Sequence, residues 1–379
     1  MGIGKGAKTK IGEVNGEKIY SYEKSETKLE NISNIEEILK QTIENYAVLE
    51  DDKTNSGYVI TDNKPSFSIY LNTVKKIVKL SYIEKKLKEL NALFKGYKNK
   101  RGLIGATASI AWLSDNDKTF ELLTYREQNK WGSTRFVDDE SVKKMDKKNK
   151  TTFDNYDYKN IHNRLTPSSP CPILYGIRGE NPKDLENAKS MIISEKVDRW
   201  LVFETNQGTD DHLDKKKISE IKPYDSVIAI GVVCKTPKSI KGGHVIFSIK
   251  DSTGEIDCAA YEPSKEFRDT VRKLVLSDIV EVYGGIRKEP ITINLEKIRI
   301  KKLVKNIIKV ENPICPKCGK HMKSIGFNQG FKCKKCKIKS KKAILKEMKR
   351  DIKIGFYEVP VCARRHLSKP LKRINHKAF

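Results

Sequence analysis

Long hydrophobic runs are absent from this chain of 379 residues, in which 33% of the residues are charged. No apolar stretch approaches the roughly 18 residues that a membrane-spanning helix needs, so we expect no membrane partner. The first residues, Met-Gly-Ile-Gly-Lys-Gly, contain no apolar core of a signal peptide. Cysteine is also scarce, and four of the eight cysteines stand singly in the sequence. Isolated thiols fit a reducing compartment, so the sequence predicts a cytoplasmic protein of about two to four domains.

Acidic residues are scarce at the C-terminal end. Residues 301–379 contain 24 Lys and Arg against 4 Asp and Glu, whereas the first 300 residues contain 51 against 45. A charge concentrated in this way is typical of a surface that neutralises phosphates, and such binding weakens steeply with salt. The alternative is a Lys-rich surface that is merely solvated. The sequence favours nucleic-acid binding, and the candidate contact residues are Lys332, Lys334, Lys335, Arg364 and Arg365.

Four cysteines lie within this basic region in two CxxC pairs. Cys315 and Cys318 form the first pair, and Cys333 and Cys336 form the second, 14 residues later. Two such knuckles can supply four thiolates in a tetrahedral shell, which leaves no open position for water. The spacing therefore predicts a zinc ribbon with one structural Zn²⁺, and the alternative is a disulfide pair or chance.

Residues 224–303 have the strand pattern of a small barrel. Alternating apolar runs predict strands over 227–233, 243–249 and 256–261, with a hairpin turn at Asp251–Gly254. A helix carrying Phe267, Val271, Leu274 and Val275 and two further strands follow. Three strands, a helix and two strands is the order of an OB-fold, which commonly binds single-stranded nucleic acid. A generic small barrel is the alternative.

A strand–helix–strand unit is expected over residues 171–217. Strand 172–177 ends near Arg178, Asn181 caps a helix with Pro182 at its first position, and strand 200–203 ends in a polar loop. Crevices at the carboxyl ends of strands commonly hold ligands. The acidic loop after the second strand, with Glu204, Asp210, Asp211 and His212, would suit a cationic small molecule, although loop solvation explains it equally well.

The first 165 residues are less clearly patterned. An amphipathic helix is expected over 75–93, and a second helix of small residues is expected from Arg101 to Leu113. Its start, with Arg101, Gly102 and Gly105, could hold phosphate on free N–H groups, or its glycines could simply allow close packing. Residues 138–160 show no clear period and are expected to form a surface excursion.

The motifs, taken in order, resemble those of the archaeal 2-agmatinylcytidine synthetase family, which modifies the wobble cytidine of an isoleucine tRNA. The resemblance extends along nearly the whole chain. It rests on residues 50–57, 101–106, 152–155, 170–179, 205–212, 242–245, 294–297, the four ribbon cysteines, 355–360 and 363–370.

The resemblance implies a multidomain α/β and α+β protein. Its expected parts are a kinase-like domain with part of a ferredoxin-like domain (1–165), the rest of the ferredoxin-like domain with the agmatine site (166–222), an OB-fold (223–303), a zinc ribbon (304–345) and a basic tail (346–379).

The resemblance also implies an activity. The family is an ATP-dependent ligase that attaches agmatine to C2 of the wobble cytidine, after activation by phosphorylation, while ATP gives AMP and pyrophosphate. The product tRNA reads AUA. The implied partners are ATP, Mg²⁺, agmatine and the isoleucine tRNA with a CAU anticodon, and no DNA.

The family pattern suggests roles for single residues. Asp210 lies in the matched Thr-Asp-x-His pattern and is the leading agmatine ligand, with Thr209 and Arg178 beside it. His212 either acts as the base that deprotonates the amine or holds the loop. Arg101, Gly102 and Gly105 are the nucleotide-binding candidates.

One departure concerns the N-terminus, where the family has an Asp-rich loop that serves Mg²⁺ and ATP. No such loop precedes Lys5, so we expect several tens of residues of the first domain to be missing from this sequence. A miscalled gene start, a fragment or a separate polypeptide would each explain it. The alternatives to the ligase are a non-catalytic OB-fold and zinc-ribbon binder of single-stranded nucleic acid, and an interaction subunit whose basic end contacts acidic protein.

Overall fold

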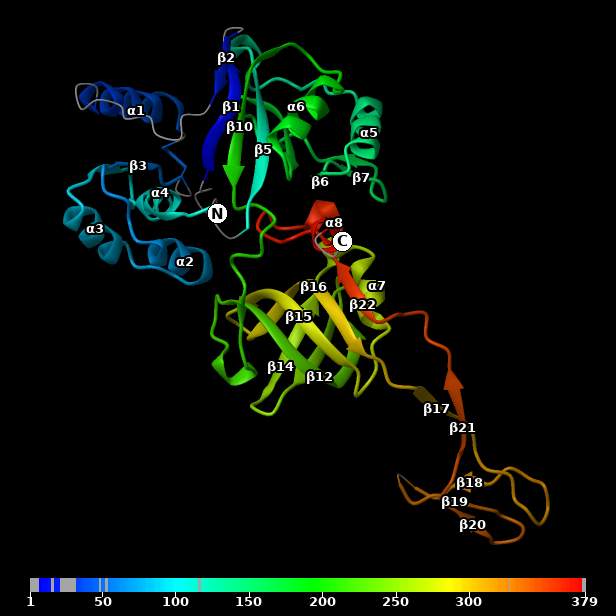
Figure 1. The fold of residues 1–379 in the computed structure, drawn as a ribbon. Helices are drawn as coiled ribbons and strands as arrows, with labels where there is room; N and C mark the ends of the chain where they lie inside the picture. Colours follow the sequence, from blue (N-terminus) through cyan, green and yellow to red (C-terminus); the bar gives the residue numbers. More distant parts are fainter. Residues whose placement is uncertain are drawn as a thin grey trace.

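The computed structural model describes residues 7–14, 17–20, 32–47, 49–51, 54–114, 117–326 and 328–376. They form two α/β units, a barrel and a small ribbon at the end of an arm (Figure 1). Among these described residues, no helix combines the length and the apolar character that crossing a bilayer requires. The Asp-rich loop expected before Lys5 falls on residues outside the described ranges.

The first unit is a small helical bundle with one strand pair. It contains α1 (Ile32–Tyr46), α2 (Phe67–Lys75), α3 (Leu80–Glu89) and α4 (Gly102–Ala111), with β3 (Gly57–Ile60) antiparallel to β4 (Leu93–Gly96). Its buried core includes Tyr70, Ile83, Leu87, Leu103 and Trp112.

The helix expected over 75–93 was wrong in its bounds. The chain leaves helix α2 at Lys76, where the backbone is extended (φ −140°, ψ 168°), and helix α3 begins only at Leu80. Ile77, which the apolar pattern placed on the buried face, lies in this break and is 70% exposed. Periodicity alone did not reveal the interruption because Ile83 and Leu87 continue the same spacing.

The second unit is a six-stranded sheet in the order β2-β1-β10-β5-β9-β6. Its strands are β1 (Ala7–Val14), β2 (Glu17–Tyr20), β5 (Thr119–Arg126), β6 (Thr152–Phe153), β9 (Ile173–Gly179) and β10 (Val197–Thr205). Strands β9 and β10 are both antiparallel to β5, so their carboxyl ends lie at one edge, as the sequence predicted. The sheet joins strands from both sides of residue 165.

Two helices pack on this sheet, α5 (Asp139–Lys148) and α6 (Pro182–Ser190) (Figure 1). Asn181 caps helix α6 as predicted, because its side chain accepts a hydrogen bond from the Lys183 N–H (2.9 Å). The expectation of a surface excursion over 138–160 was wrong, because helix α5 buries Val142 and Met145 completely. Its signals were the Asp138 cap and the acidic first turn rather than a long apolar stripe.

The third unit is a closed barrel. Strands β12 (Ser226–Ser239), β13 (Val245–Lys250), β14 (Glu255–Ala260), β16 (Thr292–Lys302) and β15 (Ile279–Arg287) follow one another, and a β12–β15 pairing closes the ring. Helix α7 (Phe267–Arg272) lies between β14 and β15 in sequence, so the predicted OB-fold order is confirmed. The helix ends before Val275, which the periodicity had assigned to it.

The C-terminal region leaves the barrel and returns to it (Figure 1). Strands β17 (Asn306–Glu311) and β21 (Ile344–Met348) pair as an arm that carries a three-stranded ribbon of β18 (Lys323–Ser324), β19 (Phe331–Lys332) and β20 (Lys339–Ser340). Strand β22 (Gly355–Glu358) then pairs with β16, and helix α8 (Leu371–His376) lies between barrel and sheet. Residues 346–379 are therefore not a free tail, as had been expected, because β22 completes a barrel edge.

Candidate active site

A hollow of about 480 Å³ opens beside the edge strand β9. One wall comes from strands β5 and β9, a second from the loop 164–171, and a third from the C-terminal segment through Val361, Arg364 and His366. The two motifs that carry Arg178 and the Pro-Cys-Pro turn therefore meet here, together with a segment far away in sequence.

Glu121 is the buried carboxylate of this hollow. Its Oε1 accepts a hydrogen bond from Arg178 Nε (3.1 Å), and its Oε2 accepts one from Gln207 Nε2 (2.5 Å). Arg178 also donates from Nη2 to His366 Nδ1 (2.9 Å), so the C-terminal segment is tied to the wall. A guanidinium is thus already bound to a carboxylate at this position, which shows that the wall can hold such a group.

The loop 164–171 is held in shape by one arginine that sequence reasoning missed. Arg135 donates to the backbone carbonyls of Pro167 (3.1 Å), Ser169 (2.8 Å), Cys171 (2.9 Å) and Ile173 (2.9 Å). Four carbonyl acceptors on one guanidinium fix the course of the loop. The sequence offered no signal for this contact, because Arg135 lies about thirty residues before the loop in an unpatterned stretch.

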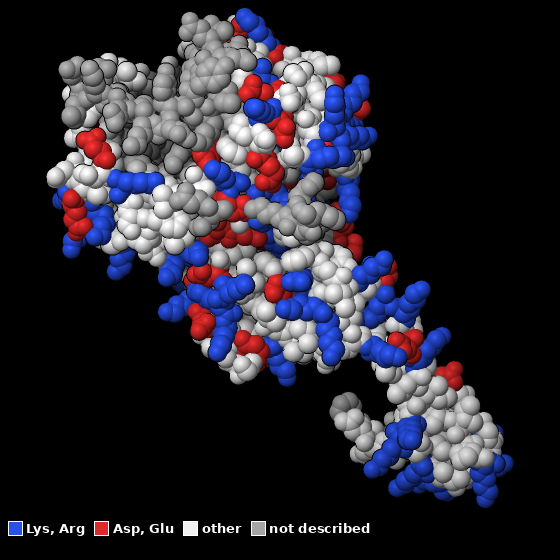
Figure 2. Space-filling view, in the orientation of Figure 1, with Lys and Arg blue, Asp and Glu red and all other residues white. Residues whose placement is uncertain are grey.

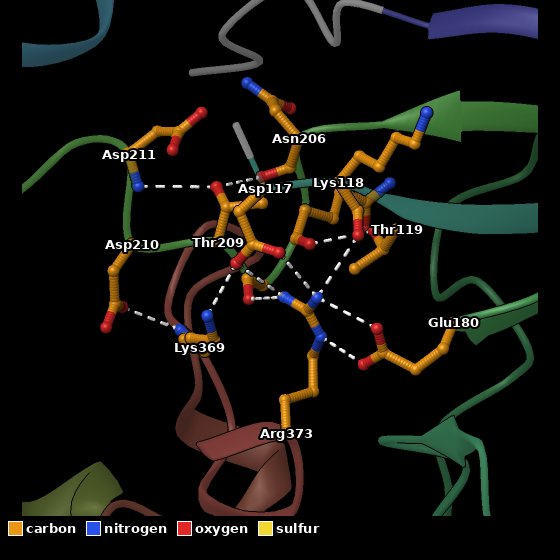
Figure 3. Close-up of polar contacts among 12 residues, drawn as sticks. Asp117, Lys118, Thr119, Glu180, Asn206, Thr209, Asp210, Asp211, Lys369 and Arg373 are labelled. Atoms are coloured by element: carbon orange, nitrogen blue, oxygen red, sulfur yellow. Dashed lines mark hydrogen bonds and ion pairs between the residues drawn. The ribbon is translucent and has the colours of Figure 1, made fainter. Parts of the chain in front are cut away.

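Asp210, the leading agmatine candidate, lies in a separate polar cluster (Figure 3). Its carboxylate accepts hydrogen bonds from Lys297 Nζ (2.6 Å) and from the Lys369 backbone N–H (2.7 Å). Thr209 donates from Oγ1 to the Asn206 carbonyl (2.7 Å). Lys297 is fully buried, and that burial lowers its pKa, so Asp210 is its charge partner. These contacts connect the sheet to the barrel and favour a structural role for Asp210.

His212 also connects the units rather than lining the hollow. The side chain is 1% exposed, and Nε2 lies 3.0 Å from Glu296 Oε2 on strand β16. Arg365 Nη1 donates to the other oxygen of Glu296 (2.8 Å). Burial would raise the pKa of Glu296, but its bonds to His212 and Arg365 lower it to about 2. Of the two roles considered for His212, the contacts favour holding the loop over acting as a base.

Tyr70 links the first unit to the same polar loop. Its hydroxyl donates to Asp211 Oδ2 (2.7 Å) and accepts from Asn206 Nδ2 (2.8 Å). Burial raises the pKa of the Asp211 carboxyl, and the neighbouring Asp117 charge acts in the same direction. The loop after strand β10 therefore contacts the helical unit through Tyr70 and the barrel through Lys297 and Glu296.

The nucleotide-binding candidates lie at the start of helix α4. A Cβ on Gly102 would lie 2.2 Å from the Asn55 carbonyl oxygen, so close backbone packing explains this glycine. The backbone N–H groups of Leu103 and Ile104 donate to the Lys100 and Arg101 carbonyls (both 3.1 Å) and are not free for phosphate. Gly105 lies one turn into the helix. Arg101 lines a groove of about 810 Å³ between the helical unit and the barrel, together with Glu296 and Arg365.

The four ribbon cysteines converge as predicted. Their sulfur atoms all lie within 4.8 Å of one another. The Cys336 N–H donates to Cys333 Sγ (3.3 Å), and this backbone bond lowers the pKa of Cys333 to about 7, which favours the thiolate that binds a metal. Gly319 and Lys337 take positive φ (66° and 59°) at equivalent turns, each with its N–H bonded to the carbonyl of the first cysteine in its knuckle. Four thiols in this arrangement fit a structural Zn²⁺.

The basic candidates differ in how free they are. Lys334 and Lys335 are exposed or partly exposed on the ribbon, as is Lys332, where Figure 2 shows Lys and Arg grouped at the tip of the molecule. Arg365 is 52% exposed despite its contact with Glu296. Arg364 is 6% exposed and forms ion pairs with Asp154 and Glu358, so its charge is largely neutralised within the protein.

Comparison with sequence families gives four matches along the chain. Residues 1–99 match the TiaS TCKD domain, residues 100–212 the TiaS FLD domain, and residues 312–352 the TiaS C-terminal zinc ribbon domain. Residues 227–301 match the OB-fold nucleic acid binding domain.

Similar whole proteins carry the same domains. The 2-agmatinylcytidine synthetase TiaS of Methanocaldococcus jannaschii, named for its isoleucine tRNA, is 44% identical over 369 residues, which is 95% of this chain and 84% of that protein. A crystal structure of TiaS with the isoleucine tRNA and ATP has a TM-score of 0.80 and 38% identity, covering 90% of this chain and 81% of that one. The crystal structure of TiaS with the same tRNA, AMPCPP and agmatine has a TM-score of 0.79 and 37% identity, covering 91% and 82%.

Proposed function

The chain belongs to the TiaS family of 2-agmatinylcytidine synthetases, and we propose from this membership that it joins agmatine to C2 of the wobble cytidine of an isoleucine tRNA in an ATP-dependent reaction. The non-catalytic alternative, an OB-fold and ribbon that only bind nucleic acid, is not favoured. It would need neither ATP nor agmatine, and both kinds of ligand are named with the similar solved structures.

The observation that carries the proposal is the hollow beside strand β9. It lies within the segment that matches the FLD domain, and its walls include the buried carboxylate of Glu121 and the loop whose carbonyls Arg135 fixes. Agmatine has a guanidinium at one end and an amine at the other. We assign the guanidinium to Glu121, where it would compete with the Arg178 guanidinium now bound there. The rival assignment is the sequence-based one, with Asp210 and Thr209 as ligands.

Zinc and magnesium stand differently in this proposal. The Cys315, Cys318, Cys333 and Cys336 cluster would hold Zn²⁺, which supplies folding energy to the ribbon and no chemistry. We expect Mg²⁺ to accompany the ATP phosphates. Among the described residues, the cysteine cluster is the one group of three or more His, Cys, Asp or Glu with metal-holding spacing, so no step is derived through Mg²⁺.

We assign the tRNA contacts to two places. The ribbon lysines Lys334 and Lys335, with Lys332 beside them, would neutralise phosphates at the end of the arm. Arg101 and Arg365, which line the groove between the helical unit and the barrel, would meet the tRNA or the nucleotide there. We also assign the protein to the cytoplasm, because all eight cysteines are free thiols.

One assay tests the function directly. The chain is incubated with labelled agmatine, ATP, Mg²⁺ and a transcript of the isoleucine tRNA with a CAU anticodon, and a transcript with uridine at the wobble position serves as the matched control. We expect label in the first transcript alone, with an agmatine-conjugated cytidine after nuclease digestion. Absence of this nucleoside, while the M. jannaschii relative makes it under the same conditions, would overturn the proposal.

A further inference from the structure

The last described residues, 359–376, form a segment that we call the clasp, and it supplies the third wall of the hollow through Val361, Arg364 and His366. We propose that Arg373 is a positioning residue that fixes the clasp against the sheet and thereby sets the shape of the agmatine hollow. This inference rests on the proposed function, because it concerns the site assigned to agmatine there.

Arg373 is enclosed although it lies on a short terminal helix. It is 2% exposed, and its guanidinium contacts three separate segments of the sheet unit (Figure 3). Nη2 donates to Asp117 Oδ1 (3.0 Å) and to the Lys118 carbonyl (3.2 Å) just before strand β5. Nη2 and Nε bind Glu180 just after β9, and Nη1 donates to the Gly208 carbonyl after β10.

These three segments adjoin neighbouring strands, since the order across the sheet is β10-β5-β9. One planar group with donors in a fixed fork therefore joins the same edge of all three strands. A lysine ammonium, which is a point charge with three donors, could not satisfy acceptors spread over these positions. The chemistry of the cage thus requires arginine rather than positive charge alone.

The rest of the clasp is aligned by backbone bonds next to this cage. The Gly208 N–H donates to the His366 carbonyl (2.7 Å), and the Asp210 N–H donates to the Leu367 carbonyl (2.9 Å). Lys369 Nζ lies 2.6 Å from Asp117 Oδ2, the carboxylate that also binds Arg373. His366 is thereby placed where its Nδ1 meets Arg178 in the wall of the hollow.

A merely stabilising arginine would act differently from a positioning one. Loss of stability lowers the amount of folded enzyme and affects every substrate alike. A displaced wall affects the ligand that the wall contacts, and a misplacement of about 1 Å can reduce catalysis by roughly a hundredfold. The distinguishing readout is therefore the KM for agmatine measured against the KM for ATP and against kcat.

The test compares Arg373→Met and Arg373→Lys with Lys372→Met. Lys372 is the adjacent residue of helix α8, and its amine faces Asp146 of helix α5 (3.8 Å) instead of the cage. We expect Arg373→Met to raise the agmatine KM about ten- to a hundredfold with an unchanged ATP KM. Arg373→Lys should recover only part of this loss, and Lys372→Met should behave as the unmodified protein.

Two further measurements keep the proposal testable. Amide hydrogen exchange at Gly208 and Asp210 should accelerate in Arg373→Met, because their acceptors lie on the clasp. In a double-mutant cycle on the agmatine KM, Arg373→Met and His366→Ala should be strongly non-additive, since both act on one wall. If Arg373→Met does not fold, Asp117→Asn, which weakens the same cage from a partly exposed side, replaces it.

The outcomes separate this inference from the proposed function. An unmodified chain that makes the agmatine-conjugated cytidine, with variants whose agmatine and ATP KM values change equally or not at all, overturns the positioning role and leaves the function intact. Additive effects in the double-mutant cycle also overturn it. A chain that makes no product contradicts the proposed function itself.

Discussion

Glu121 and Asp210 are both carboxylates near the carboxyl edge of the sheet, but different groups hold them. Glu121 faces the hollow and binds Arg178, whose side chain is 20% exposed and can move. Asp210 neutralises the fully buried Lys297. Removing one partner of a buried ion pair leaves an unpaired charge, which costs about 3–5 kcal/mol. The two residues should therefore respond differently to the same amide substitution.

We predict that Glu121→Gln raises the KM for agmatine, because an amide cannot form the charge-assisted pair with the guanidinium. Such a bond contributes about 1.5–3 kcal/mol, which corresponds to a KM roughly ten- to a hundredfold higher. Asp210→Asn should instead lower the free energy of unfolding by about 3 kcal/mol with a smaller effect on agmatine. Steady-state kinetics and denaturant titration of both variants provide the check.

The reverse pattern would restore the sequence-based assignment. If Asp210→Asn raises the agmatine KM far more than the KM for ATP or tRNA, while Glu121→Gln leaves it unaltered, Asp210 and Thr209 are the ligands. Glu180→Gln serves as a control, because Glu180 lies at the same sheet edge but binds Arg373 rather than facing the hollow.

At the scale of elements, local chemical signals predicted more than periodicity did. The four cysteines, the turn at Asp251 and the Asn181 cap each depend on neighbours in sequence, and the structure has all three as expected. Helix α5 was missed because its buried apolar stripe is only Val142 and Met145, within a segment otherwise made of charged and polar residues. The OB-fold was predictable because five apolar strands occur in its order.

The parts of the site that the sequence did not reveal are long-range contacts. Arg135 binds a loop about thirty residues away, and Arg373 binds three segments that lie 165 to 256 residues before it. Neither residue has a distinctive neighbourhood in sequence. Arg364 was assigned to tRNA from local charge, yet Asp154 and Glu358 pair with it in the fold. Charge counted along the chain does not show which cations are already neutralised.

The zinc ribbon is the element whose stability should depend on metal. Its buried cluster contains the cysteines with Met322 and Phe331 and few other apolar side chains, so metal binding must supply most of its folding energy. We predict one Zn²⁺ per chain, and local unfolding of the ribbon in Cys333→Ser while the barrel, which has its own larger core, stays folded. Metal analysis and hydrogen exchange of residues 312–340 measure both effects.

Cys258→Ser is the matched control, because Cys258 is a buried cysteine of the barrel and not a metal candidate. It should retain zinc. Protein with four free thiols in the ribbon and no bound zinc would contradict the metal assignment.

At the scale of the whole molecule, the arm separates the ribbon from the body that contains the hollow (Figure 1). The arm's first and last residues, Asn306 and Met348, are partners across its two strands. Arm and ribbon can therefore be replaced by a short turn that joins residues 305 and 349. This change keeps strand β22 and the clasp, whereas deletion of everything after residue 303 would remove both.

We predict that this replacement weakens tRNA binding and reduces its salt dependence while agmatine binding persists. Each lost phosphate contact should lower the slope of log affinity against log salt by about 0.9. If Lys332, Lys334 and Lys335 each contact one phosphate, replacing these three with Ala in the intact chain should lower the slope by about 2–3. Lys183, Lys189 and Lys196, which belong to the sheet unit, form the control set of equal charge. A slope unaltered by the arm replacement would mean that the basic ribbon is only a solvated surface and that the tRNA binds the body alone.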